Sequence, residues 1–363
     1  MSLFAFGSNV SFQFGSSDVI NTCVPQKIAF FEDKKIITLE TGYLHSFALT
    51  DQGLFSWGCN DDGQLGREGN EEDFLEVKFP KIVTGRFMDY KNIVIKNGKV
   101  QFQNKVEIKK IQAGGSFSAF LTKKGHLFIT GTFRNSRGVF GLTKSTKNSF
   151  MPIPVMSRVK DIMAGKDFLL IHTNNNDLYA IGNNDFNQIR DYTMRNKESL
   201  VPKLISTKVK FFGCGASHLV FITKNLNVYA RGLDNSNQTN LPFEIKELTN
   251  ENACKIIGGS YTTYLLIDDL LYSLGMNKDG QLGLGKKSNF ENFSYVTKEV
   301  EDIKCKMDFV LFKNKDELFT FGASNFGENG FEDDKLSPTK LNFKEVKNFA
   351  AGADFSLVEG ELL

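Results

Sequence analysis

One stretch of the chain combines residue types that suit binding to another macromolecule. Residues 131–142 read GTFRNSRGVFGL, in which two arginines, an asparagine and a serine stand among glycines before the apolar pair Val139 and Phe140. A polar, glycine-rich loop that then offers two large apolar side chains to water predicts a protruding wedge with an apolar tip. Exposed apolar groups often mark an interaction site, so the wedge favours contact with a partner. Ordinary variation in a loop sequence is the alternative interpretation.

Motifs for covalent chemistry do not occur in the sequence. There is no GxSxG and no GxxxxGK[ST] string, and the Gly-x-Gly fragments 213–215 and 283–285 belong to an internal repeat. The five cysteines are an odd number, with no CxxC spacing and no clustering with the four histidines. This pattern predicts reduced core cysteines, no metal and no cofactor. We therefore expect binding chemistry rather than an enzyme with a small-molecule substrate.

Three aspartates share one position of that internal repeat. Asp167 follows Ala164-Gly165-Lys166, and Asp308 and Asp354 stand at the matching places further along the chain. If the repeats close into a ring, the three side chains gather around one rim, where a partner could meet them. An aspartate at such a place can equally cap a turn.

The elements that must position these residues are copies of one short hairpin unit. In residues 39–66, two strand-like runs at 43–50 and 54–57 are joined by the turn Asp51-Gln52-Gly53. Two landmarks of this unit recur at steps of 44 to 51 residues, with one step of 72: a small residue followed by Gly, and an aromatic residue three places before Gly. The first landmark falls at 41–42, 113–114, 164–165, 214–215, 258–259 and 351–352, with a degenerate copy at Cys305-Lys306.

A repeat divided between the two ends of the chain predicts a closed ring. A seventh copy of the aromatic landmark, Phe4 and Gly7, has no first half before it, and the first half at 346–358 has almost no chain after it. The N-terminal strand would complete the sheet that the C-terminal strands begin, which removes exposed sheet edges. We predict an all-β fold with a single domain, residues 1–363, forming a seven-bladed β-propeller closed by pairing of the N- and C-terminal strands.

The one long step contains an insertion, residues 67–105. Alternating residues on both sides of Asn97-Gly98 are a strong signal for a two-residue β-hairpin, so we expect an extra hairpin at the rim. The insertion either contacts a partner or is a neutral loop decoration.

Charge and hydropathy restrict the partners further. The formal net charge of +2 does not demand a nucleic acid or a membrane surface. The N-terminus lacks the basic segment and apolar run of a signal peptide, and no run approaches the roughly 18 apolar residues of a membrane span. We expect a soluble intracellular protein with no membrane partner.

The repeat resembles that of a known family. The turn GCNDDGQLG at 58–66, with the preceding His45-Ser46, is similar to the repeat of the regulator of chromosome condensation superfamily, and the likeness covers essentially the whole chain. The segment GTFRNSRGVFGL, followed by KNSFMP at 147–152, resembles the wedge-bearing segment of the superfamily's exchange factor for the small GTPase Ran. The resemblance implies a guanine-nucleotide exchange factor, or releasing factor, that promotes GDP release by inserting a wedge at the phosphate and magnesium site. It implies no covalent chemistry.

The resemblance also implies roles for individual residues. Asp167 matches an acidic residue of blade four that meets the GTPase, and His45 matches a repeat histidine and is a candidate for the same GTPase-facing rim. A lone repeat histidine can equally be a hydrogen-bonding residue at the end of a strand. Two family positions differ, with Gly115 in place of an acid and Thr262 in place of a histidine, and Asp308 and Asp354 are candidates to compensate on the same face. The implied wedge comprises Arg134, Asn135, Ser136, Arg137, Gly138, Val139, Phe140 and Gly141.

The family implies a second partner, the nucleosome, and a nuclear location with a role in nucleocytoplasmic transport, with the cytoplasm as a further location. A blade-four loop carries Arg190, Arg195 and Lys197, which correspond to a chromatin-contacting loop or form a solvated loop. The rival hypothesis is a non-catalytic propeller scaffold that binds another protein. A light-sensing propeller relies on clustered tryptophans, whereas Trp57 stands alone.

Overall fold

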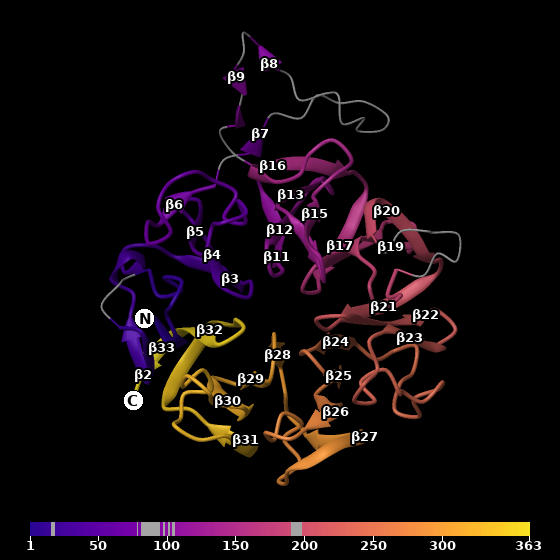
Figure 1. The fold of residues 1–363 in the computed structure, drawn as a ribbon. Coiled ribbons are helices and arrows are strands. Elements are labelled where there is room, and N and C mark those ends of the chain that lie inside the picture. Colours follow the sequence, from indigo (N-terminus) through magenta and orange to yellow (C-terminus); the bar gives the residue numbers. More distant parts are fainter. Residues whose placement is uncertain are drawn as a thin grey trace.

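The computed structural model describes residues 1–15, 19–77, 106–189 and 198–363, together with four two-residue strands within 79–103. Seven antiparallel sheets stand around one axis as the blades of a propeller (Figure 1). The described part of the chain contains no α-helix and a single 3₁₀ turn, η1 (Ala29–Phe31). The all-β class and the seven blades predicted from the repeat are therefore confirmed.

Each blade runs outward from an innermost strand beside the axis. The first half of the ring consists of blade one, β32 (Phe343–Ala351), β33 (Phe355–Leu362), β1 (Ser2–Ser8) and β2 (Asn21–Lys27); blade two, β3 (Ile36–Thr41), β4 (His45–Thr50), β5 (Leu54–Gly58) and β6 (Leu75–Glu76); and blade three, β11 (Ile108–Ala113), β12 (Phe117–Thr122), β13 (Leu127–Gly131) and β16 (Ser149–Met156).

The second half contains the remaining four blades, of which blade five has three strands. They are blade four, β17 (Val159–Ala164), β18 (Phe168–Thr173), β19 (Leu178–Asn183) and β20 (Glu198–Ser206); blade five, β21 (Val209–Cys214), β22 (His218–Thr223) and β23 (Val228–Gly232); blade six, β24 (Cys254–Gly258), β25 (Thr262–Ile267), β26 (Leu270–Asn277) and β27 (Ser288–Thr297); and blade seven, β28 (Asp302–Cys305), β29 (Phe309–Asn314), β30 (Glu317–Gly322) and β31 (Lys335–Lys340).

The repeat landmarks coincide with strand ends. The small residue before Gly is the last residue of the innermost strand in six blades, as Ala113 is in β11, and Cys305 of the degenerate copy ends β28 in the same way. The second strand of a blade is covered on both faces by neighbouring blades, and β12, β18 and β25 are buried throughout. Double-sided burial explains why their sequences are nearly continuous apolar runs rather than alternating ones.

Blade one closes the ring. β1 lies between β33 and β2, and its six paired residues run from Ser2 opposite Gly360 to Gly7 opposite Phe355. Leu3, Ala5, Phe355 and Leu357 are buried in one core cluster on this blade. The predicted closure by the two chain ends is confirmed.

Of the insertion, the described strands β7 to β10 lie at the outer rim, and β7 contacts β16 (Figure 1). β8 (Ile95–Lys96) and β9 (Lys99–Val100) pair antiparallel, with Ile95 opposite Val100, at the place where the sequence indicates a hairpin. β7 (Phe79–Pro80) and β10 (Phe102–Gln103) form a second short pair. The rest of 78–105 lies outside the described residues.

No helix in the described part of the chain is both long enough and apolar enough to cross a membrane.

Candidate functional site

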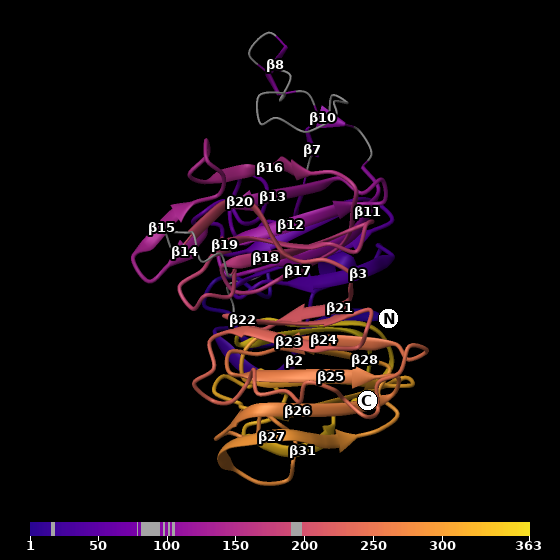
Figure 2. The ribbon, with the colours of Figure 1, turned by 90° about the vertical axis from the view of Figure 1, so that its right-hand side faces the viewer.

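The candidate wedge is a separate two-stranded hairpin. β14 (Phe133–Asn135) and β15 (Gly138–Gly141) pair antiparallel, with Arg134 opposite Val139 and Asn135 opposite Gly138. The hairpin follows the C-terminal end of β13. It projects from one face of the propeller, on the side away from the chain ends (Figure 2). We call this face the wedge face.

Gly131 allows the chain to leave the blade at this point. Its φ of +85° is in the left-handed region, and a Cβ there would lie 2.2 Å from the carbonyl oxygen of Ser116. The Thr132 N–H donates to the same oxygen at 2.8 Å. A side chain at position 131 would therefore displace the start of the hairpin.

The base of the hairpin belongs to the core of blade three. Phe133 is fully buried, with its ring 4.7 Å from that of Phe117 and stacked at 6.2 Å on that of Phe140. Val139 and Phe140 are half-buried, whereas Ser136 and Arg137 at the turn are exposed. The prediction of an apolar tip is therefore wrong, because the core of blade three takes up the apolar pair and leaves a polar tip.

Arg134 connects the hairpin to blades two and four. Its Nε and Nη2 both donate to Oδ2 of Asp62, at 2.9 and 2.7 Å, and Asp62 lies on the blade-two turn. The Arg134 N–H donates to Oδ1 of Asp167 at 3.2 Å, and the Arg134 carbonyl accepts from Nδ2 of Asn183 at 2.9 Å. The hairpin is thus held from both sides.

Two further carboxylates hold the turn. The Ser136 N–H donates to Oδ2 of Asp185 at 3.0 Å. Arg137 Nη2 donates to Oε1 of Glu198 at 2.8 Å, and Asn135 Nδ2 donates to the same oxygen. These contacts fix the orientation of the turn, while three quarters of the Arg137 side chain stays exposed. The result is a preorganised projection whose tip exposes the Arg137 side chain.

Sequence reasoning missed three of these anchors: Asp62, Asp185 and Glu198. Asp62 and Asp185 could have been found from the sequence, because each occupies the repeat turn of a blade that adjoins blade three. Glu198 begins β20, and no pattern in the sequence indicates that it reaches the hairpin.

The three aspartates of one repeat position lie on the wedge face, each before the second strand of its blade. Their carbonyl oxygens accept from the residue after a landmark glycine, at 2.8 Å for Asp167, 2.9 Å for Asp308 and 2.7 Å for Asp354. Burial raises the pKa of Asp167 to about 6, against the opposing effect of Lys166 and Arg134. Burial, with Asp279 and Asp354 nearby, raises the pKa of Asp308 to about 6 as well.

These aspartates differ in how they are used. The carboxylate of Asp167 accepts from the hairpin, whereas the buried Oδ1 of Asp308 has no hydrogen-bond partner in the described part of the chain. Burial also raises the pKa of Asp354. Only Asp167 is built into the hairpin.

His45 is not on the surface. It is fully buried, its Nε2 lies 2.7 Å from the Ser118 hydroxyl, and burial lowers its pKa to about 3. His218 has the same arrangement with Thr263 at 2.8 Å. The prediction that His45 faces a partner is wrong in this structure, because it is a neutral strand-end residue that joins adjacent blades. Thr262 is likewise fully buried.

The loop that carries Arg190, Arg195 and Lys197 lies outside the described residues.

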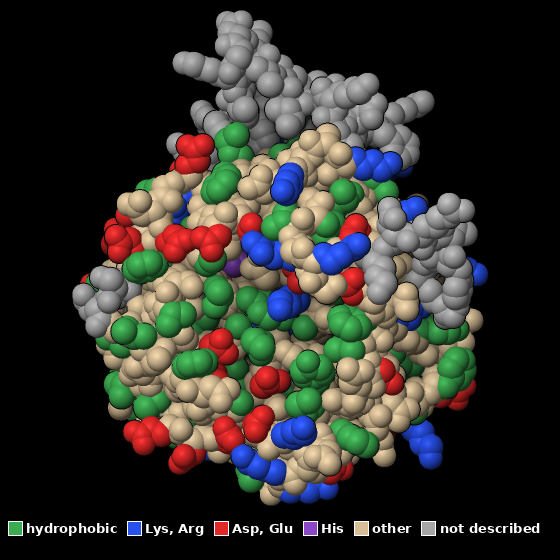
Figure 3. Space-filling model, in the orientation of Figure 1, with side chains coloured by type: hydrophobic (Ala, Val, Ile, Leu, Met, Phe, Trp, Pro, Cys, Tyr) green, Lys and Arg blue, Asp and Glu red, His purple; other side chains and the backbone are tan. Residues whose placement is uncertain are grey.

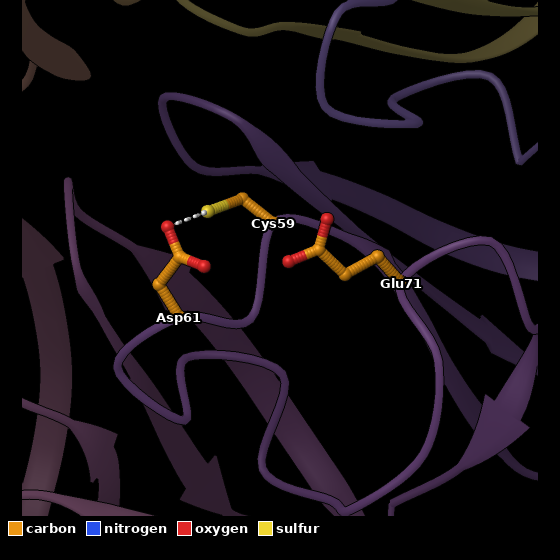
Figure 4. A group of neighbouring side chains, drawn as sticks. All are labelled: Cys59, Asp61 and Glu71. Carbon is orange, nitrogen blue, oxygen red and sulfur yellow. Dashed lines mark hydrogen bonds between the residues drawn. The ribbon is translucent and has the colours of Figure 1, made fainter.

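Another group of side chains lies on the blade-two turn. Cys59, Asp61 and Glu71 each bring one possible ligand atom within 4.8 Å of the others (Figure 4). The Cys59 thiol donates to Oδ2 of Asp61 at 3.7 Å, and Oε1 of Glu71 accepts from the Asn60 N–H at 3.1 Å. Burial raises the pKa of Cys59 to about 11, so the thiol stays protonated at neutral pH. Hydrogen bonding within the turn accounts for the group.

Charge on the wedge face is uneven. Lys and Arg side chains gather just above its centre in Figure 3, with acidic side chains close beside them and over the rest of the face. Arg137 on the hairpin and Lys166 beside Asp167 are both exposed. The hairpin thus stands among side chains of both charges, since Asp62, Asp167, Asp185 and Glu198 contact it.

Comparison with known proteins gives the family. The model of the RCC1-like domain matches residues 2–358. The chain belongs to this family. A relative named regulator of chromosome condensation, from Mus musculus, is 33% identical over 161 residues, which are 44% of this chain and 33% of the mouse protein. The matched stretch thus spans about a third of that relative.

Two further comparisons extend the likeness over most of the chain. The ultraviolet-B receptor UVR8 of Arabidopsis thaliana is 25% identical over 350 residues, covering 90% of this chain and 74% of the receptor. The crystal structure of Prp20p from Saccharomyces cerevisiae superposes with a TM-score of 0.82 at 20% identity, over 100% of this chain and 92% of that one. At this identity the second likeness establishes the propeller fold alone.

Proposed function

We propose that this member of the RCC1 family is a guanine-nucleotide exchange factor for a Ran-type small GTPase. The observation that carries the proposal is the hairpin β14–β15, which projects from one face and is held by Asp62, Asp167, Asp185 and Glu198. The fold supports it too, since the structurally similar Prp20p has binding properties toward Gsp1p and histones.

The hairpin would act by differential binding. A nucleotide held at picomolar affinity is stabilised by about 16 kcal/mol, so an exchange factor must offer comparable binding energy to the nucleotide-free GTPase. A rigid projection loses little entropy when it binds, and its contacts can therefore compete with those of the phosphates and the magnesium ion. No bond is broken in the protein, and exchange is accelerated in both directions.

The structure changes which residues are expected to meet the GTPase. Ser136 and Arg137 form the exposed turn and would enter the phosphate region first. Asp167 would act mainly by positioning the hairpin. Asp308 and Asp354 lie on the same face, where they would contact a GTPase broad enough to cover the mouth of the ring.

Chromatin is the proposed second partner, and the nucleus the proposed location. The histone binding of Prp20p supports this assignment. Arg190, Arg195 and Lys197 are its candidate contacts, and their replacement by Glu should weaken nucleosome binding while leaving nucleotide exchange unchanged.

Release of fluorescent GDP from Ran is the direct test. Wild-type protein should accelerate release, and Arg137→Glu should reduce the acceleration by at least about tenfold, because an acidic tip is repelled by phosphate. The matched control is Lys124→Glu, an equal charge change on an exposed turn of the opposite face, which should behave like wild type. Equal rates for the two variants would contradict the wedge assignment.

The same experiment separates the rival function. A non-catalytic scaffold would give no acceleration of GDP release with either protein. The likeness to UVR8 over 90% of the chain shows that the repeat alone does not specify exchange activity. A light-sensing role of the tryptophan type is disfavoured, because the single tryptophan, Trp57, is fully buried and donates its indole N–H to the Gln13 carbonyl.

A further inference from the structure

The central channel of the propeller is lined by lysines. A cavity of about 170 Å³ lies between the innermost strands and the loops that follow them, and residues of blades two to seven line it. Glu40 is the only acidic residue among the described side chains of its wall. The lysines in the wall are Lys110, Lys166, Lys255, Lys304 and Lys306.

The lysines of the channel wall outnumber the carboxylates that pair with them. Lys110 pairs with Asp161 at 2.8 Å. Lys255 and Lys304 share the single carboxylate of Asp302. The Lys304 Nζ lies 3.9 Å from Oδ2 of this carboxylate. The remaining acid, Glu40, lies 3.7 Å from Lys306. In the inner part of the channel, two carboxylates, Asp161 and Asp302, thus face three ammonium groups, which leaves one positive charge in excess. At the mouth, Glu40 faces Lys306, and Asp167 lies beside Lys166 with Asp308 nearby.

The lysines influence one another. Burial, followed by the charge of Lys304, lowers the pKa of Lys255 to about 8, and Lys110 contributes in the same direction. Asp302 opposes this change without cancelling it. Side chains of Lys110, Lys255 and Lys304 are each about one-third exposed to the channel, so a solute that enters can reach them. An anion bound there would relieve the repulsion.

One of these lysines stands where the repeat has glycine. Six blades carry Gly after the small residue that ends the innermost strand, and blade seven carries Lys306. Its Nζ reaches the Ala113 carbonyl of blade three at 2.6 Å and approaches Glu40 of blade two. Because six copies fold with glycine, the propeller does not need a lysine here. Its effect is to bring another positive charge to the mouth of the channel.

We propose that the central channel binds a small, multiply charged anion of the oligophosphate class. Lys110, Lys255 and Lys304 surround the bound phosphates, and Lys306 closes the site at the wedge face. The cavity volume suits two or three phosphate groups and excludes a folded partner. Ammonium groups bind phosphate oxygens through charge-assisted hydrogen bonds, which favours phosphate over a singly charged anion. This site is separate from the hairpin and does not depend on GTPase binding.

Isothermal titration of the full chain with inorganic tripolyphosphate tests the proposal. At constant ionic strength we expect one saturable site per chain, and weaker binding as salt is raised. Lys304→Gln should weaken binding by at least about tenfold, because one charge-assisted contact is lost. The matched control is Lys340→Gln on the outer strand β31, where the lysine is paired with Glu317 at 2.5 Å, and its affinity should equal that of wild type. Absence of saturable binding, or equal affinity in the two variants, overturns the proposal.

A measurement on the wild-type chain covers the case in which Lys304→Gln does not fold. Acetylation of lysines by a succinimidyl ester, followed by peptide mass spectrometry, should label Lys255 readily because its pKa is low. Tripolyphosphate should protect Lys255 and Lys304 and leave Lys340 unprotected. Equal labelling of the channel lysines with and without the anion would contradict the assignment.

Discussion

Blades two and three place very different structures at the same repeat position. In blade two, the turn after β5 closes on itself: Oδ1 of Asn60 accepts from the Leu65 N–H at 3.0 Å, and Oε1 of Gln64 accepts from the Asp62 N–H at 2.9 Å. In blade three, the hairpin after β13 satisfies its polar groups with side chains of other blades. The first arrangement is self-contained, and the second depends on its neighbours.

The closed turn is the rule around the ring. In five blades an Asn or Asp side chain accepts from the N–H five residues later, and a Gln four residues later accepts from the N–H between them; the pairs are Asn9 and Gln13, Asn60 and Gln64, Asn184 and Gln188, Asp234 and Gln238, and Asn277 and Gln281. Blade three lacks this pair of side chains. Its loop is therefore free to extend and must be anchored from outside, which is the role of Asp62 and Asp185.

The largest expected effect comes from separating the hairpin from its core. Phe133→Ala should lower the free energy of unfolding by about 3–5 kcal/mol, because a fully buried ring that contacts Phe117 and Phe140 is lost. Urea unfolding measures the change. Phe150→Ala, on the exposed part of β16, is the control and should change stability by less than about 1 kcal/mol. A similar decrease in the free energy of unfolding in both variants would show that Phe133 does not hold the hairpin in the core of the blade.

A smaller effect is expected when one anchor is weakened. Asp62→Asn removes the charge that Arg134 contacts with two N–H groups, while its side chain is nearly isosteric. Because Arg134 is partly exposed, the pair is worth about 1 kcal/mol, and the rate of Ran nucleotide release should fall about fivefold. Asp61→Asn, one residue earlier on the same turn, should leave the rate unchanged. An unchanged rate in Asp62→Asn would mean that the hairpin keeps its orientation without blade two.

The two regions also differ in how far sequence could predict them. The closed turns, the strand ends and the ring follow from residues close together in the chain, so a repeat of landmarks was sufficient. The position of the projecting hairpin was also recognisable from the sequence, because residues 131–142 interrupt that repeat. The burial of Phe140 and the anchoring by Glu198 could not be predicted from the sequence, because both arise from packing between blades that no local pattern describes.

A third prediction contrasts Asp308 with Asp167, whose pKa values are both raised to about 6. Asp308 has a folded pKa of about 6 and an ordinary value near 3.8, so the folded state favours its protonated form. Asp308 therefore contributes to the stability of the folded state below about pH 4, and this contribution is lost as the pH rises through 6. Asp308→Asn should raise the melting temperature at pH 8 and change it little at pH 4. Asp167→Asn should raise the melting temperature at pH 8 by less, because the Asp167 carboxylate accepts a hydrogen bond from the Arg134 N–H. Equal gains would show that the hairpin contact contributes nothing to the difference.

The smallest effect is expected at His45, which the family resemblance made a candidate for the partner surface. In four blades phenylalanine occupies the equivalent first position of the second strand, as Phe117 does in blade three. His45→Phe should leave GDP release within about twofold of wild type, because the residue is fully buried. The Ser118 hydroxyl would still donate to the Gln64 carbonyl at 2.8 Å, so the cost in stability should be about 1 kcal/mol or less. If this variant, folded as judged by its melting curve, lost exchange as fully as Arg137→Glu, the GTPase would be contacting blade two, and the difference between the closed turn and the hairpin would not explain the activity.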